Sequence, residues 1–471
     1  MPSTRRDFVK NVSLASAGFM LAKPAAALAG SAAAIAGPAG APAPLSGAAA
    51  GRTVRLGLIG TGFRGETHLA LALRLPDVEV AAICDVDDQM LARAKDIIQK
   101  SGKAMPKVFT GSNYAYRELL AMKDLDGVII ATPWEWHNPM ILDALSAGIK
   151  YVATEVILGI TLQEHWDVVK AAESNQAHVM MLENVCYRRD VMAAMNMARQ
   201  GIFGELLHLQ GGYQHDLRTV KFNDGKPPYN SGVEFGEKAF SEARWRTNHS
   251  VHRNGDLYPT HGVGPLAMMI DINRGNRFMS LSSFSTKTRG LHNYIVKHGG
   301  EEHPNAKVRF RLGDIVTTHI HCANGETILL QHDTNNPRPY SLGFRVQGTN
   351  GLWMDVANSV YIEGQSKNND EWDSADDWFK KYDHPLWQKW SKDAEGAGHG
   401  GMDFFVLHGF VESIRRGAPT PMDVYDAAAW SAITPLSESS IELGFQTVPF
   451  PDFTGGQWMN RKNEFAANDE Y

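Results

Sequence analysis

The chain has 471 residues, enough for two or three domains. Hydrophobic residues make up 43% and charged residues 21%, values typical of globular proteins that exclude a disordered or fibrous chain. The formal net charge of -6 argues against a nucleic-acid-binding protein, whose phosphate-contacting surface needs an excess of Lys and Arg. No apolar run reaches the roughly 18 to 20 residues of a membrane span. Three cysteines are too few for a disulfide framework.

The first 51 residues have the pattern of an export signal followed by a tether. Arg5 and Arg6 precede an aromatic residue, an aliphatic residue and a lysine, which resembles the bacterial twin-arginine signal. Ala27-Leu28-Ala29 is a small-x-small site for a signal peptidase. Residues 30–51 are almost uncharged and rich in Ala, Gly and Pro, which predicts a flexible linker. We therefore expect a signal peptide over 1–29, the twin-arginine export machinery as a partner, and a periplasmic or exported protein.

Residues 52–185 begin in the order of a dinucleotide-binding domain. The apolar run 54–59 predicts a buried parallel strand, and it leads into a complete GxGxxG, Gly60-Thr61-Gly62-Phe63-Arg64-Gly65, before a helical pattern over 66–75. Gly60, Gly62 and Gly65 permit a tight turn and a close approach of a pyrophosphate to the helix N-terminus. A second strand over 78–84 ends in Asp85, whose carboxylate suits ribose hydroxyls and repels a 2′-phosphate. The pattern predicts NAD in preference to NADP.

Three further apolar runs predict parallel strands, over 126–132, 150–156 and 178–183. The first ends in Trp134-Glu135-Trp136-His137, the second contains Glu155, and the third is followed by Asn184. Because the carboxyl ends of parallel strands line the ligand crevice of an open sheet, we expect the tetrapeptide to face the cofactor.

The pattern changes after residue 205. Alternating runs over 207–213, 278–286, 316–321 and 327–332 predict an antiparallel sheet, with helical segments near 265–270 and 403–415. The expected fold class is α/β plus α+β: an N-terminal Rossmann domain with a parallel sheet over 52–185, and a substrate-binding domain over 186–471 with a large, open, mainly antiparallel sheet.

This arrangement resembles the superfamily of glucose-fructose oxidoreductase and inositol dehydrogenase. That superfamily usually carries Glu-Lys-Pro after the fifth strand, with a lysine that assists hydride transfer, whereas this chain has Glu155-Val156-Ile157. The departure favours a narrower resemblance, to family 109 of the glycoside hydrolases, NAD-dependent enzymes typified by α-N-acetylgalactosaminidase. The segments that carry it are ATPWEWH (131–137), TEV (154–156), MLENVCY (181–187), GYQHDLR (212–218), RWRTNHSVHRNGDLYPTHGVGP (244–265) and GHGGMDF (398–404).

The resemblance implies two sets of contacts. Those to NAD would be made by Phe63, Arg64, Asp85, Trp134, Glu135, Trp136, His137, Glu155, Val156 and Asn184. Those to the sugar would be made by Glu183, Tyr213, Arg246, Tyr258, Pro259, Thr260, His261 and Tyr340. The expected substrate is a small molecule or glycan that bears terminal, preferably α-linked, N-acetylgalactosamine.

The family mechanism oxidises sugar C3 with NAD+, removes the acidified proton from C2, expels the aglycone from C1, adds water and reduces C3 again. The resemblance thus implies a redox-neutral enzyme, and this scheme suits an exported protein, which has little external NAD for exchange. Proton transfer requires tuned acids and bases. His261 is the first candidate, since imidazole titrates near neutral pH. Tyr213 and Tyr258 are phenols that could relay protons or bind the acetamido group, and Arg246 suits an anchor or an enolate stabiliser.

Several alternatives remain open at this point. An exported NAD(P)-dependent sugar or polyol oxidoreductase of the same superfamily is one, and an inert NAD-bearing sugar-binding protein is another. His319 and His321 alternate on one strand face, but no third ligand is evident and we expect no metal. His399 is expected at a helix terminus rather than in catalysis. Homo-oligomer formation is an open question, with dimerisation through the open sheet suggested by analogy alone.

Overall fold

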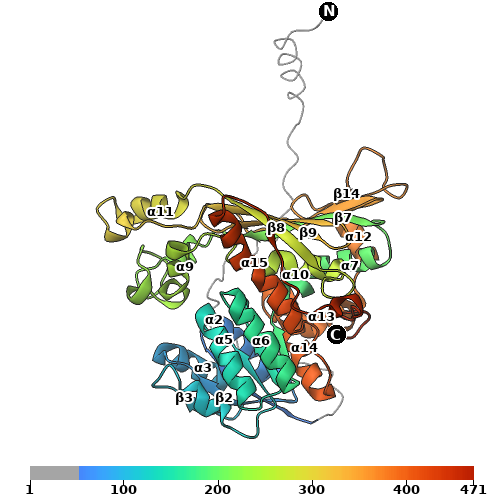
Figure 1. Ribbon diagram of the computed structural model, residues 1–471. Coiled ribbons are helices and arrows are strands. Elements are labelled where there is room, and N and C mark those ends of the chain that lie inside the picture. The colour runs from blue at the N-terminus through green and yellow to red at the C-terminus, as the bar shows by residue number, and fades with distance from the viewer. Residues whose placement is uncertain (1–51) are drawn as a thin grey trace, which may run out of the picture. The chain divides into compact units, whose positions relative to one another are not determined.

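The computed structural model describes residues 52–471 (Figure 1). The predicted signal peptide and linker, residues 1–29 and 30–51, lie outside the described residues. Across 52–471 no helix has the length and apolar character needed to cross a membrane.

The N-terminal half is a six-stranded sheet in the order β3-β2-β1-β4-β5-β6, with all neighbours parallel. Its predicted Rossmann architecture is confirmed. The third strand along the chain, β3, was not predicted, because it is short and lacks a buried apolar run. The strands are β1 (Val54–Ile59), β2 (Val78–Cys84), β3 (Lys107–Phe109), β4 (Gly127–Ile130), β5 (Tyr151–Thr154) and β6 (His178–Met181). The helices are α2 (Phe63–Arg74), α3 (Asp88–Ser101), α4 (Tyr116–Leu120), α5 (Trp134–Ser146) and α6 (Leu162–Asn175).

The C-terminal half contains a nine-stranded sheet in the order β14-β13-β12-β11-β7-β10-β9-β8-β15. Every neighbouring pair is antiparallel except β7 and β10, which run parallel because the long chain between them crosses over. The predicted large, mainly antiparallel sheet is confirmed. Its strands are β7 (Leu206–Gln214), β8 (Phe278–Ser285), β9 (Ile315–Cys322), β10 (Thr327–Asp333), β11 (Arg345–Gly348), β12 (Gly351–Met354), β13 (Ser359–Ile362), β14 (Asp373–Ser374) and β15 (Val448–Pro449).

Helix α10 (Thr260–Met269) packs across β7 on the inner face of this sheet (Figure 1). The approach requires glycine, because a Cβ on Gly262 would lie 2.5 Å from the backbone nitrogen of Gly212. The helix begins five residues earlier than expected, since Pro265 lies inside it instead of at its start. Proline removes one backbone donor and usually ends or begins a helix, which is why the sequence pattern placed the boundary at that residue. His261 consequently lies in the first helical turn.

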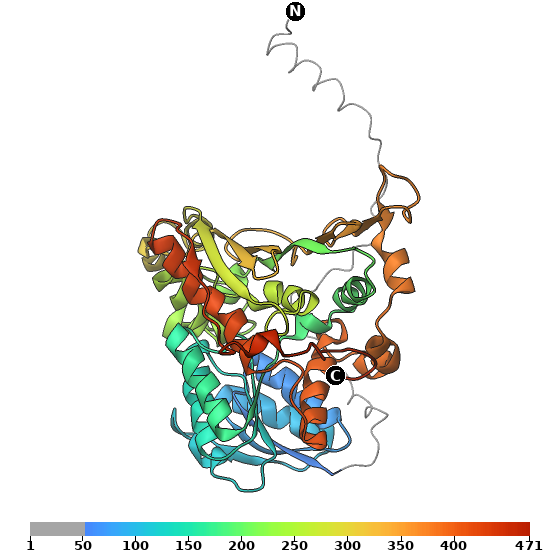
Figure 2. The same ribbon diagram turned by 45° about the vertical axis from the view of Figure 1, so that its right-hand side comes forward.

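Two long helices from the C-terminal part pack on the Rossmann domain (Figures 1 and 2). Helix α14 (Met402–Arg416) contacts α2 and β1, and α15 (Val424–Glu442) contacts α6 and β6. Gly127 on β4 admits α14, because a Cβ there would lie 2.9 Å from the Ile414 side chain. One continuous hydrophobic core therefore includes residues from both sides of the domain boundary predicted at residue 185.

The remaining elements surround the large sheet. They include a lobe with its own small core of Phe222, Val233, Leu291, Ile295 and Phe310. Their bounds are η1 (Asn184–Tyr187), α7 (Arg189–Arg199), α8 (Arg218–Lys221), η2 (Gly236–Lys238), η3 (Ser241–Arg244), α9 (Arg246–His252), α11 (Gly290–Gly299), η4 (Pro304–Lys307), α12 (Ala375–Lys381), α13 (Pro385–Ala394), η5 (His399–Gly401) and η6 (Gln457–Met459).

Candidate active site

The glycine-rich turn between β1 and α2 has the shape that a dinucleotide needs. Gly60 has a φ of +89°, and a Cβ on it would lie 2.4 Å from the carbonyl oxygen of Ala131. A Cβ on Gly65 would lie 2.0 Å from the carbonyl oxygen of Gly60, whereas one on Gly62 would meet nothing within 4 Å. Gly60 and Gly65 are thus required by packing, and Gly62 leaves open space at the N-terminus of α2. These features fit a pyrophosphate at this turn.

Asp85 lies at the end of β2, directly beside this turn. One of its carboxylate oxygens accepts hydrogen bonds from the backbone nitrogen (2.6 Å) and the hydroxyl (3.1 Å) of Thr61, and the other accepts one from the backbone nitrogen of Asp87 (2.9 Å). The side chain is therefore fixed at the place where the fold needs a ribose acceptor.

The tetrapeptide 134–137 forms the first turn of α5, at the carboxyl end of β4. The Trp134 indole donates to the carbonyl oxygen of Val156 (3.2 Å). His137 is buried, and its ring nitrogens contact the carbonyl oxygens of Ile157 (2.5 Å) and Thr132 (2.8 Å). Both ring nitrogens of His137 are thus occupied by carbonyl oxygens of the protein, and its contact with NAD stays a prediction.

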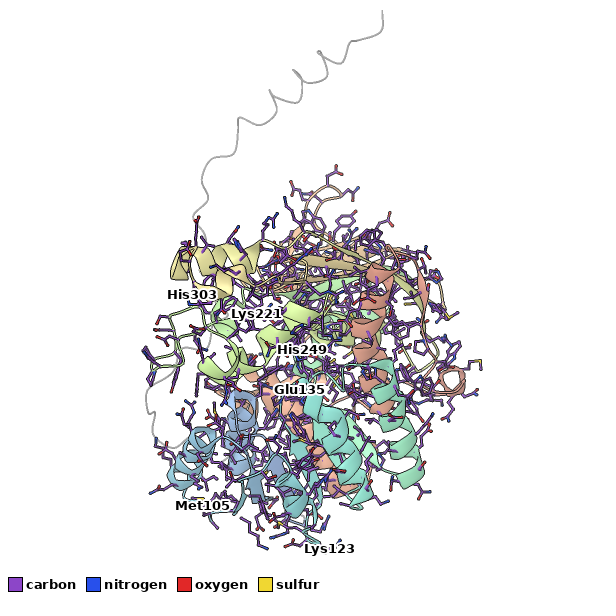
Figure 3. All side chains as sticks on the ribbon, turned by 60° about the vertical axis from the view of Figure 1, so that its left-hand side comes forward. Met105, Lys123, Glu135, Lys221, His249 and His303 are labelled. Carbon is purple, nitrogen blue, oxygen red and sulfur yellow. The ribbon has the colours of Figure 1, made fainter. Side chains whose placement is uncertain are left out.

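Glu135 points the other way, toward the second domain. Figure 3 shows it beside His249 of α9, whose Nε2 lies 3.5 Å from a Glu135 carboxylate oxygen. Its neighbour Trp136 is half-buried and packs edge-on against Tyr114. The turn thus joins the Rossmann domain to the substrate-binding domain.

Arg64 belongs to a charged network that joins two other residues predicted for the cofactor, Glu155 and Asn184, to two that were not, Asp403 and His68. Its guanidinium contacts the carboxylate of Glu155 at 2.8 Å and that of Asp403, on α14, at 3.3 Å. Asn184 donates to Asp403 at 2.7 Å, and the buried His68 contacts Glu155 at 2.6 Å. Asp403 is fully buried, so α14 brings a buried carboxylate to the Arg64 guanidinium.

Mutual charge stabilises this network. Burial works against ionisation of Glu155 and Asp403, but the Arg64 charge outweighs it and holds the pKa of both carboxyl groups well below the usual range. Burial also works against the Arg64 charge, and the two carboxylates raise its pKa in return. All three groups are therefore ionised at every pH at which the protein would function.

His399 lies on the turn before α14, where Gly398, Gly400 and Gly401 all have positive φ. Its Nδ1 is 2.6 Å from the Asp403 carboxylate, and its side chain is 54% exposed. The expected helix-terminal position is observed, but the same position brings an accessible imidazole, backed by a buried carboxylate, to the edge of the crevice.

His261 forms a second pair of this kind. Its Nδ1 lies 2.7 and 2.9 Å from the carboxylate oxygens of Glu183, which follows β6 and is fully buried. A carboxylate can only accept, so it fixes the proton on Nδ1 and leaves Nε2 as the nitrogen that accepts a proton. The sugar contact of Glu183 stays a prediction, and its buried carboxylate also orients the His261 imidazole.

Two tyrosines adjoin His261. The ring centroids of Tyr213 and Tyr258 are 4.6 Å apart, and each lies about 5 Å from the imidazole, at 5.3 and 4.9 Å. Burial raises the pKa of Tyr213 to about 12 and that of Tyr258 well above 10. Both phenols therefore stay protonated near neutral pH and serve as hydrogen-bond donors, which leaves the imidazoles as the groups that exchange protons.

Arg246 is enclosed by aromatic rings. Its guanidinium carbon lies 5.1 Å from the ring centroids of Trp134 and Tyr258 and 5.6 Å from that of Trp245, and Glu242 contacts it at 2.9 Å. Stacking of this kind holds the planar cation in one orientation. Arg246, which is predicted to anchor the sugar, is therefore held in a fixed position.

The other residues predicted to contact the sugar differ in their exposure to solvent. Tyr340 is 39% exposed, and its ring meets His215 edge-on at 4.9 Å. Pro259 is buried, and Thr260 is fully buried with a hydroxyl that has no partner. Pro259 and Thr260 thus form the start of α10, and their contacts with the sugar stay predictions.

Sequence reasoning did not assign three residues that the structure brings to this site. They are His215, whose Nδ1 contacts the Tyr213 hydroxyl at 3.0 Å, Glu242 and Asp403. Burial lowers the pKa of His215 to about 4, so it is neutral and can accept from the phenol. Their signals were present: His215 and Asp403 lie in segments of the family resemblance, and Asp403 follows His399 by four residues, one helical turn.

The two histidines of β9 were considered as metal ligands. His319 and His321 both lie on the exposed face of β9. Among residues 52–471 no three His, Cys, Asp or Glu side chains are grouped so that they could hold a metal.

The fold resembles sugar and polyol dehydrogenases. Levoglucosan dehydrogenase, solved with NADH and levoglucosan, superposes with a TM-score of 0.61 at 20% identity, covering 85% of this chain and all of that one. A myo-inositol 2-dehydrogenase from Lactobacillus plantarum superposes with a TM-score of 0.57 at 15% identity, covering 85% of this chain and 100% of that one. At these identities the likeness concerns the fold alone.

The sequence matches are more specific. Residues 54–183 match the oxidoreductase family with an NAD-binding Rossmann fold, and residues 187–460 match the C-terminal domain of glycosyl hydrolase 109. A glycosyl hydrolase family 109 protein of Stenotrophomonas maltophilia (strain K279a) is 59% identical over 428 residues, 90% of this chain and 94% of that protein. An alpha-N-acetylgalactosaminidase of Tannerella forsythia is 51% identical over 475 residues, 99% of this chain and all of that protein.

Fold and site together define an NAD-dependent enzyme with a Rossmann domain joined to an open-sheet substrate domain. The chain belongs to family 109 of the glycosyl hydrolases. It is a glycoside hydrolase whose cofactor is NAD.

Proposed function

We propose that this glycosidase removes terminal N-acetylgalactosamine, preferably α-linked, by a redox-neutral route through C3 and C2. The observation that carries the proposal is the presence of two carboxylate-backed imidazoles, His261–Glu183 and His399–Asp403. The relative from Tannerella forsythia, named for this substrate, supports the choice of sugar.

The two imidazoles suit different steps. His261 is largely enclosed and lies among Tyr213, Tyr258 and the domain interface, so it is placed to take the proton from a ring hydroxyl. His399 is exposed, and an aglycone must extend toward solvent. We therefore assign the C3 hydroxyl proton to His261 and protonation of the departing glycosidic oxygen to His399.

NAD, which the glycine-rich turn and Asp85 would hold, would supply a reversible hydride acceptor for C3, so that no external oxidant would be consumed. The C3 ketone acidifies the C2 hydrogen, and loss of that proton drives the aglycone from C1. Water then adds at C1 while C2 regains a proton. Arg246, held in one orientation by three rings, is the cation available to stabilise the enolate oxygen.

The site also provides for the acetamido group. Tyr213 and Tyr258 remain neutral donors, and each can bind a carbonyl oxygen without a competing negative charge. A neutral His215 accepts from Tyr213 and fixes the direction of its hydroxyl. These are the groups we expect to select an N-acetylated sugar.

The test uses a chromogenic N-acetylgalactosaminide without added NAD. Release of chromophore, with deuterium at C2 of the product sugar after turnover in heavy water, is the expected result. A 3-deoxy substrate should bind without being cleaved. Hydrolysis of the 3-deoxy substrate, with no deuterium at C2, would refute the route through C3. Net accumulation of an oxidised sugar would instead indicate an oxidoreductase, and binding without turnover a sugar-binding protein.

A further inference from the structure

A segment of the substrate-binding domain crosses back to the Rossmann domain beside the nucleotide site. This bridge segment, residues 229–244, runs from the lobe through η2 and η3 and ends just before α9. It contains Tyr229, Phe240 and Arg244, none of which the sequence pattern or the family resemblance assigned to the cofactor.

One contact of the bridge segment is polar. Arg244 donates to a carboxylate oxygen of Asp87 at 2.9 Å. The other oxygen of Asp87 caps α3 by accepting from the backbone nitrogens of Gln89 and Met90. The backbone nitrogen of Asp87 donates to Asp85. Asp87 thus connects Arg244 to Asp85, whose carboxylate is expected to bind the ribose.

The second contact is aromatic. Phe240 packs edge-on against Phe63, the first residue of α2, with ring centroids 6.0 Å apart. Tyr229 stacks on the other side of Phe240 at 3.8 Å, and the Arg93 guanidinium lies 5.1 Å from the Phe63 ring. Phe240 is 7% exposed, whereas Phe63 is 42% exposed, so the contact covers one part of the Phe63 ring and leaves the rest accessible.

We propose that the bridge segment completes the nucleotide site and sets the rate at which NAD leaves it. Phe63 and Asp85 are both expected to contact NAD, and the bridge contacts Phe63 directly and Asp85 through Asp87. A dinucleotide held by these residues leaves only when the bridge contacts open. This goes beyond the proposed reaction: an enzyme that restores its cofactor in every cycle gains nothing from exchange.

The experiment measures exchange of bound NAD in the full-length protein without any sugar. Protein loaded with NAD is mixed with excess isotope-labelled NAD, and the bound label is followed by mass spectrometry after denaturation. Arg244→Ala should accelerate exchange about two- to fivefold, as expected for an exposed ion pair. Phe240→Ala should accelerate it roughly tenfold, because a packed aromatic contact contributes more. High salt should reduce the difference in NAD exchange rate between Arg244→Ala and the unaltered protein, because it screens the ion pair.

Two matched variants serve as controls. Arg117→Ala breaks an exposed ion pair (2.8 Å, to Asp143) inside the Rossmann domain, and Phe284→Ala removes one ring of a surface stack with Phe445 (5.2 Å). Neither should change the exchange rate. If Phe240→Ala fails to fold, Arg244→Glu replaces it in the experiment. The substitution is at an exposed position, and a negative charge opposite Asp87 should separate the bridge segment from α3 and so accelerate exchange.

The inference is overturned if Arg244→Ala, Arg244→Glu and Phe240→Ala all exchange NAD at the rate of the two controls. Because no sugar is present, this outcome is independent of whether the protein cleaves N-acetylgalactosaminides. A failure of the proposed reaction would likewise leave the exchange result standing.

Discussion

At the scale of single residues, the site depends on pairs in which a buried carboxylate holds an imidazole. His261 and His399 come from distant parts of the chain, yet each has an acidic partner within 2.7 Å. Such a partner fixes the tautomer and orientation of the ring, which is a requirement for general acid or base catalysis.

Replacing His261 with Ala should lower kcat about a hundredfold or more, the usual contribution of a general base. Glu183→Gln should have a smaller effect, because an amide can still orient the ring but does not stabilise its cation. Bound NAD, measured by mass spectrometry, should be unchanged in both. His319→Ala, on the exposed face of β9, is the control. Unimpaired turnover by His261→Ala would return this residue to a structural role.

Replacing His399 with Ala should affect substrates unequally. A good leaving group, such as a nitrophenolate, departs without a proton, whereas an alkoxide needs one. We expect a small loss of kcat with nitrophenyl substrates and a loss of about a hundredfold with natural glycans. A uniform loss across a series of leaving groups would argue against a role in aglycone protonation.

At the scale of elements, close backbone contacts decide where the functional side chains lie. Helix α10 carries His261 in its first turn and approaches β7, which carries Tyr213 near its end. The two elements meet through Gly262, Gly211 and Gly212, so a small change at this crossing alters the distance between both side chains.

Gly262→Ala should therefore destabilise the protein and reduce activity together. The added Cβ would lie 2.5 Å from backbone, which cannot rotate away, and overpacking of this kind costs about 1–3 kcal/mol or more. Thermal unfolding and kcat should both be measured, with Gly102→Ala, at an open left-handed position with no atom near its Cβ, as a strained but uncrowded comparison. Equal losses in the two variants would contradict the packing argument.

Lys221 of α8 makes stability depend on pH. It lies beneath the large sheet (Figure 3), and its ammonium donates to Thr334 (2.9 Å) and Asn335 (2.7 Å). Burial lowers its pKa to about 7, below the roughly 10.4 of an unfolded chain. The unfolded state thus binds more protons between these values, and the free energy of unfolding should rise with pH across that window.

Denaturant titrations of the unaltered protein and of Lys221→Met at pH 7 and pH 9.5 test this expectation. The unaltered protein should gain stability relative to the variant as the pH rises, because the buried lysine loses the charge that burial penalises. If the difference in free energy of unfolding between the two proteins is the same at both pH values, the pKa of Lys221 is not lowered in the folded protein.

At the scale of the whole molecule, the two halves form one enzyme because α14 and α15 return to the Rossmann domain. Asp403 on α14 contacts Arg64 and Asn184, so the substrate-binding domain contributes a carboxylate to the residues predicted to hold the cofactor. We also propose that the folded enzyme is exported by the twin-arginine route, on the basis of Arg5 and Arg6.

Changing Arg5 and Arg6 together to lysine should leave the enzyme in the cytoplasm, folded and active, because the signal is an address separate from the fold. Cell fractionation with an activity assay measures this. Ser46→Ala, in the predicted linker and outside the signal pattern, provides the control. Recovery of the double variant outside the inner membrane would exclude the twin-arginine route.

The sequence by itself determined the parts that depend on local pattern. The strands at 54–59 and 78–84, the GxGxxG turn and Asp85 follow from apolar runs and from glycine at fixed spacing, and the family followed from short motifs along the chain. Each of these depends on residues that are near one another in the chain, where spacing fixes geometry.

Only the tertiary structure decided which side chains meet. Glu183 lies 78 positions from His261, and Asp403 lies 339 from Arg64, so no local pattern pairs them. No local pattern indicates that Glu183 and Thr260 are buried, or that residues 229–244 reach the nucleotide site. These facts depend on the packing of distant elements, because burial and charge pairing are properties of the folded chain and not of its order.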